Sequence, residues 1–138
     1  MTVIATPPAT RISTLSRTRL AMLRAAYLFI GVGLVVVKWP QLPEAHTLPL
    51  YEGVTLCLLT AMSLLAFVGL LRPLGMLPVL VFETAWKVLW LGLVALPKAV
   101  SGTLDADSTA VAFNCSFVVL VIVLTPWPLA WRRLVSGR

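Results

Sequence analysis

Four long apolar blocks, separated by short polar or proline-rich breaks, constrain this chain more than any other feature of its sequence. A hydrophobic run of about 20 residues has the length of a helix that crosses a lipid bilayer. The blocks cover approximately residues 20–37, 50–71, 74–96 and 109–125. The sequence therefore predicts an all-α fold, an integral membrane four-helix bundle.

The composition agrees with this prediction, since 59% of the residues are hydrophobic and only 12% are charged. A soluble domain is closer to about half apolar and a quarter charged. We expect residues 1–19 to form a basic cytoplasmic tail, 20–131 the four-helix domain, and 132–138 a second basic cytoplasmic tail. No soluble domain is predicted.

The orientation of the helices follows from the distribution of charge. Lys38 and Lys98 fall on one side of the predicted bundle, together with Glu44, Glu52, Asp105 and Asp107. All the arginines fall on the other side, and cytoplasmic loops are the ones that carry an excess of basic residues. Both termini are therefore predicted to be cytoplasmic. The arginines in question are Arg11, Arg17, Arg19, Arg24, Arg72, Arg132, Arg133 and Arg138.

The net charge of +6 does not indicate nucleic-acid binding, because the bases lie at the chain ends and in one short loop rather than on a soluble face. We therefore predict no nucleic-acid partner. The lipid bilayer is the expected surrounding.

The breaks between the blocks predict how the helices are connected. Residues 72–75, Arg-Pro-Leu-Gly, predict a tight turn that makes an antiparallel hairpin of the second and third helices. Residues 38–50 and 97–108 predict two outer loops. Asp107 or Ser108 is expected to cap the fourth helix, and the Pro-Trp-Pro at 126–128 to end it.

The third block contains the residues most suggestive of a function. Glu83 and Lys87 fall near its middle, where a charge costs about 3 kcal/mol or more on insertion scales. Their i, i+4 spacing, with the glutamate first, favours a helical ion pair. Trp86 and Trp90 share the same helical face.

Two interpretations of this pair remain open. A self-neutralising pair would help the helix insert and would lock the bundle. Alternatively, the carboxylate could bind a proton or a ligand with lysine as its partner, because ionisable groups inside a membrane are functional candidates.

Polar residues of other helices are predicted to meet the pair. Counted from the outer helix ends, Tyr27 and Thr60 reach the depth of Lys87, and Arg24 and Ser63 reach that of Glu83. Glu83 could therefore bridge to Arg24 instead of only to Lys87. The candidate intramembrane polar site comprises Glu83, Lys87, Trp86, Trp90, Tyr27, Arg24, Thr60 and Ser63.

The sequence indicates no metal site, no cofactor and no catalytic motif. Cys57 and Cys115 fall inside apolar blocks and are expected to be buried and inert, although their similar depth leaves a disulfide open. His46 is the only histidine, and with Glu44 it offers too few ligands for a closed site.

Three segments resemble a group of small bacterial membrane proteins of unassigned function: residues 26–33, 38–40 and 82–90. The general plan is similar to that of DoxX-like four-helix proteins. This resemblance implies a bacterial inner membrane and no particular activity. Small multidrug transporters are comparable in size, but their essential glutamate lies in the first helix, where this chain has none.

The leading hypothesis is a non-enzymatic accessory or assembly partner built around a buried Glu83–Lys87 pair, in a larger membrane complex or a homo-oligomer. An oligomeric proton-coupled transporter or channel is the first alternative, and a polar cavity open to one side would favour transport. A membrane redox or quinone-binding protein is the second alternative.

Overall fold

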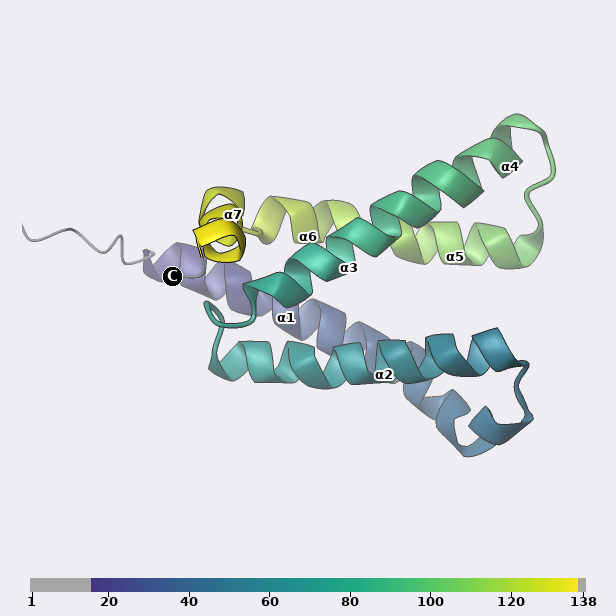
Figure 1. Ribbon diagram of the computed structural model, residues 1–138, viewed down its shortest axis with the longest axis horizontal. Coiled ribbons are helices and arrows are strands. Elements are labelled where there is room, and N and C mark those ends of the chain that lie inside the picture. The colour runs from purple at the N-terminus through teal and green to yellow at the C-terminus, as the bar shows by residue number, and fades with distance from the viewer. Residues whose placement is uncertain (1–15, 137–138) are drawn as a thin grey trace, which may run out of the picture.

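The computed structural model describes residues 16–136, and within this range the chain is all-helical (Figure 1). Four helical stretches are long and apolar enough to cross a membrane: Arg17–Thr47, Leu50–Leu71, Leu77–Val100 and Ala106–Leu124. The all-α prediction with four such helices is confirmed. Residues 1–15 of the predicted N-terminal tail and residues 137–138 of the predicted C-terminal tail lie outside the described range.

The first stretch is longer than predicted at both ends. Helix α1 spans Arg17–Lys38 and begins where the Ser16 hydroxyl accepts a hydrogen bond from the backbone N–H of Arg19. The predicted outer loop is instead a 3-10 helix, η1, over Trp39–Thr47. Prolines at the start of η1 and inside it are compatible with a 3-10 helix, because the φ angle of proline is already in the helical range. Arg17 and Arg19, assigned to the tail, are therefore helical.

Helix α2 spans Leu50–Leu71, as predicted, and the turn at Arg72 leads into α3, Leu77–Trp90. The third stretch continues beyond its predicted end through a π-helical turn, η2 (Leu91–Ala95), and a short helix, α4 (Leu96–Val100). Pro97 was expected to open a loop. The wider π turn precedes Pro97, and in it the Leu96 N–H donates to the Leu91 carbonyl. The chain therefore remains helical past the proline.

The fourth stretch begins earlier than predicted. Helix α5 spans Ala106–Ser116 and is capped by Asp105, whose Oδ1 accepts a bond of 2.7 Å from the Ser108 N–H. Asp107 and Ser108, the expected caps, lie inside the helix. After a break at Phe117, α6 continues over Val118–Leu124, and Thr125 is extended. The C-terminal residues form a further helix, α7 (Trp127–Ser136), which includes most of the segment predicted to be the second basic tail.

The helices pack closely at one end and diverge towards the other (Figure 1). Helix α1 packs most extensively on α2, α6 packs against both α1 and α3, and α7 packs against α3. At the diverging end, η1 lies with α1 and α2, whereas α5 contacts η2. Two arms result, and the core lies at the converging end.

Tyr27 is the central side chain of that core. It is fully buried, and its hydroxyl donates a bond of 2.7 Å to the carbonyl of Pro73 in the turn between α2 and α3. Its ring lies directly over Gly69, where an added Cβ would approach ring atom Cε1 to 2.5 Å. Only glycine allows this close contact of α1 with α2. The rest of the core consists of Leu23, Ala26, Ile30, Met62, Ala66, Leu77, Val79, Leu80, Val121 and Ala130.

Candidate functional site

Glu83 and Lys87 form the ion pair that their spacing predicts. Lys87 Nζ lies 2.6 Å from Glu83 Oε1, one turn further along α3. The glutamate side chain is 1% exposed, whereas that of the lysine is 12% exposed. The carboxylate is therefore enclosed by protein, and the ammonium group lies nearer the surface.

Trp86 completes the surroundings of the carboxylate. Its indole Nε1 donates a bond of 2.7 Å to Glu83 Oε2, and its ring centroid lies 5.6 Å from Lys87 Nζ. The Nζ–Oε1 contact is short, yet Oε1 accepts no hydrogen bond of good directionality. We treat the contact as an ion pair, because attraction between charges depends on distance more than on angle. Both carboxylate oxygens are thus committed to neighbours on the same helix.

The pair borders a cavity of about 170 Å³ that is enclosed by α1, α2, α3 and α5. The cavity extends to Lys38, the last residue of α1, and its rim residues Phe29, Val37 and Val111 are exposed. It therefore opens at the surface between the diverging arms. Its lining consists of Phe29, Ile30, Gly33, Leu34, Val37, Lys38, Leu59, Glu83, Trp86, Lys87, Val111, Asn114 and Cys115.

The contributions of α5 and of Lys38 to this cavity were not predicted from the sequence. A signal was nevertheless present, because Val111, Asn114, Cys115 and Val118 follow the i, i+3, i+4, i+7 spacing of one helical face. Cys115 and Val118 are buried, and the first three line the cavity.

Two predicted site residues of α2 bond elsewhere. The Thr60 hydroxyl donates to the Leu56 carbonyl at 2.7 Å. Ser63 donates to the Thr60 carbonyl at 2.6 Å and accepts a bond of 3.1 Å from Trp39 Nε1. The hydrogen bond from Trp39 thus connects η1 to α2 through Ser63. Ser63 does not line the Glu83 cavity.

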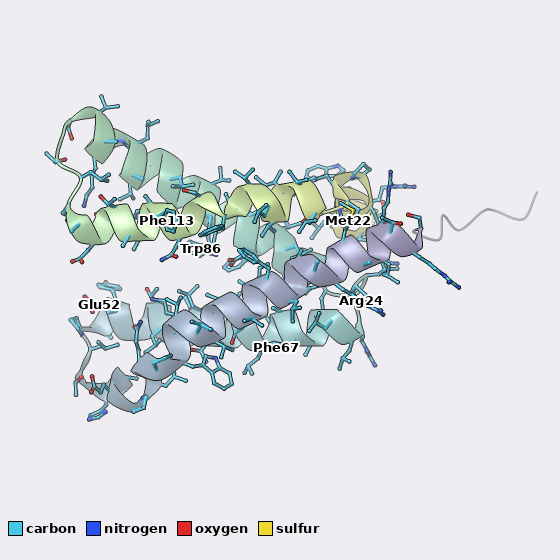
Figure 2. The ribbon with its side chains drawn as sticks, turned by 180° about the vertical axis from the view of Figure 1, so that it is seen from behind. Met22, Arg24, Glu52, Phe67, Trp86 and Phe113 are labelled. Carbon is cyan, nitrogen blue, oxygen red and sulfur yellow. The ribbon has the colours of Figure 1, made fainter. Side chains whose placement is uncertain are left out.

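The remaining predicted residues are also outside the cavity. Tyr27 bonds the carbonyl of Pro73. Arg24 is exposed near the N-terminal end of α1, distant from Trp86 in Figure 2, and among residues 16–136 it forms no ion pair. Trp90 and Trp86 line a separate apolar hollow of about 360 Å³ against α2. The structure therefore unites Glu83, Trp86 and Lys87 from the predicted set of eight.

Both cysteines are free thiols. Cys115 is buried at the cavity wall, but Cys57 is exposed on α2, contrary to the expectation that both are buried. Their side chains occupy different environments, and no disulfide joins them. His46 is exposed within η1.

The chain matches no protein-family model, and no curated protein and no solved structure shows significant similarity to it. The resemblance to DoxX-like proteins is therefore not shown by these comparisons. Function has to be inferred from the cavity and its residues.

Proposed function

We propose that this chain is a non-enzymatic, multi-pass protein of the bacterial cytoplasmic membrane, with both termini in the cytoplasm, that acts as an accessory protein by holding a small partner group in the Glu83–Lys87 cavity. The observation that carries this proposal is the position of the ion pair. Both residues line an open cavity, and the lysine remains partly exposed instead of being sealed between helices.

The bonding of Glu83 supports binding over catalysis. A general base needs a carboxylate that is available to the proton it removes. Here one oxygen is paired with Lys87 and the other accepts from Trp86, so the carboxylate is occupied by its own helix. The same bonds hold Lys87 in a fixed position at the cavity, which suits recognition of a bound group.

A membrane location is supported by the outer surface of the helices. Large apolar side chains are exposed along all four long stretches, including Leu58, Phe82, Leu93 and Val119. Contiguous apolar surface of this extent is unfavourable in water and favourable in a hydrocarbon environment.

The experiment that tests the accessory role is affinity purification of the tagged full-length chain from its native membrane in mild detergent, followed by quantitative mass spectrometry. Wild type, the Glu83→Gln/Lys87→Met double variant and Gly92→Leu are compared. Gly92 lies outside the cavity, and a Cβ there meets open space. We expect one set of membrane proteins to be enriched with wild type and Gly92→Leu and lost with the double variant. Equal recovery with all three would contradict the proposal.

A second candidate is proton-coupled transport, which a partly open cavity lined by Glu83 and Lys87 favours. Proteoliposomes loaded with a pH-sensitive dye distinguish the two. Transport requires a proton flux that disappears in Glu83→Gln, whereas the accessory role predicts no flux above that of empty liposomes.

A further inference from the structure

Lys87 presents unused hydrogen-bond donors to the cavity. An ammonium group carries three N–H bonds. Lys87 Nζ contacts Glu83 Oε1, and it lies 5.6 Å from the centroid of the Trp86 ring. The lysine lines the cavity and remains partly exposed there, so it can donate to a bound group without breaking the ion pair.

Asn114 adds a second polar group from the facing helix α5. A side-chain amide offers two donors and one acceptor. Most of the remaining wall is apolar, formed by Phe29, Ile30, Leu34, Leu59, Val37 and Val111. A ligand for this space needs a polar portion that accepts hydrogen bonds and a hydrophobic body.

The charges select against an ionic headgroup. Glu83 and Lys87 cancel, so the pair offers a bound anion no net charge to offset the loss of its hydration. A cation would meet both Lys87 and Lys38 in the lining of the cavity. An uncharged hydrogen-bond acceptor avoids both penalties.

The volume limits the size of the polar portion. The cavity measures about 170 Å³, and an apolar cavity of about 150 Å³ in a protein core is enough to bind benzene. The space therefore suits one six-membered ring. The exposed rim at Phe29, Val37 and Val111 leaves an apolar exit for an attached chain.

We propose that the cavity binds an uncharged amphiphile, whose ring-sized headgroup accepts hydrogen bonds from Lys87 and Asn114 and whose apolar tail leaves past the rim into the bilayer. This inference rests on the proposed membrane function, because the exit of the tail requires lipid around α1 and α5. It names the chemistry of the group that the accessory protein holds.

Two glycines provide a matched pair of variants for the test. Gly33 lines the cavity, and a Cβ built there meets no atom within 4 Å, so Gly33→Leu fills the space without a backbone clash. Gly92→Leu adds the same side chain at another unobstructed helical position outside the cavity. Asn114→Leu removes the amide group of an exposed residue and serves as a second variant.

The probe is 2-decyl-1,4-benzoquinone, a single ring with one apolar chain, titrated into the purified full-length protein in detergent micelles while quenching of tryptophan fluorescence is followed. Trp86 lines the cavity and reports on its occupancy. We expect saturable quenching in wild type and Gly92→Leu, and affinity weaker by about tenfold or more in Gly33→Leu and Asn114→Leu. Decylbenzene, which has no acceptor, and decanoate, which is an anion, should both fail to compete.

Three results would each overturn the inference: no saturable quenching in the wild type, equal affinity in Gly33→Leu and Gly92→Leu, or displacement of the quinone by decylbenzene or decanoate, seen as loss of the quenching. Circular dichroism of each variant establishes that it is folded before titration. Failure here with intact partner recovery in the purification above rejects only the ligand. Successful binding in micelles without partner recovery rejects only the accessory role.

Discussion

Replacing Glu83 and Lys87 singly and together tests whether the two residues are energetic partners. Lys87→Met leaves the Glu83 carboxylate almost completely enclosed, with Trp86 as its only remaining partner among those described. An uncompensated buried charge costs about 3–5 kcal/mol, and insertion scales give a similar value of about 3 kcal/mol. We expect Lys87→Met to lower the free energy of unfolding by this amount.

Glu83→Gln should cost less. The glutamine carbonyl can still accept from the Trp86 indole, and Lys87, being 12% exposed at the cavity, can turn to water. We expect a loss of about 1–3 kcal/mol, that of one broken charged hydrogen bond. The double variant leaves no buried charge and should fall within about 1 kcal/mol of wild type. The coupling energy of the cycle is then at least about 3 kcal/mol, at or above the upper end for residues in contact.

The assay is equilibrium unfolding by SDS in mixed micelles, followed by circular dichroism for the wild type and the three variants. Losses that simply add, with the double variant least stable, would refute the partnership. A cost of Glu83→Gln that exceeds that of Lys87→Met would refute the asymmetry derived from their burial.

The remaining predictions concern packing, capping and topology. Gly69→Ala should destabilise the protein by about 1–3 kcal/mol, because its methyl group would overlap the Tyr27 ring. Gly92→Ala, at a position with open space, should stabilise it by up to about 1 kcal/mol. Unfolding in SDS measures both changes. Hydrogen bonding by Ser108, through its side chain and then its N–H, holds the pKa of Asp105 below its usual range, with Lys98 contributing. The pKa of Asp105 is therefore lower in the folded state than in the unfolded state. Asp105 stabilises the fold at pH values above its unfolded pKa, and this contribution is lost as the pH falls through its folded pKa. The free energy of unfolding of Asp105→Asn should depend less on acid pH than that of wild type. An alkaline phosphatase fused after Arg138 should be inactive, and clear periplasmic activity would reject cytoplasmic termini.

Hydrophobic pattern was sufficient to predict the four long helices but not all of their ends. The predicted bounds of α2 agree with the structure because Pro49 precedes it and Arg72-Pro73 follows it. The third stretch passes Pro97, since the π turn at Leu91–Ala95 accommodates the missing N–H. For the fourth helix, Asp107 and Ser108 were the predicted caps, Asp105 is equally suitable by residue type, and only the hydrogen bond from the Ser108 N–H distinguishes Asp105.

The candidate site was predictable where it depended on one helix and not where it depended on several. The contacts of Glu83 with Trp86 and Lys87 follow from i+3 and i+4 spacing alone. Positions on other helices were ranked by depth, which assumes that all helices run parallel and end at the same level. The helices diverge, and Trp39 turns back onto Ser63, so equal depth did not bring Ser63 or Arg24 to Glu83.

The divergence of the two arms also bears on the choice between a structural and a functional role for the pair. A pair that served only insertion would require no cavity beside it, because the contact between the two residues already offsets their charges. Instead the glutamate is enclosed while the lysine lies at the wall of an open cavity, opposite Asn114. Glu83 and Trp86 thus fix the position of Lys87, and Lys87 faces the space. This division of roles is the arrangement expected of a binding group held in place by its neighbours.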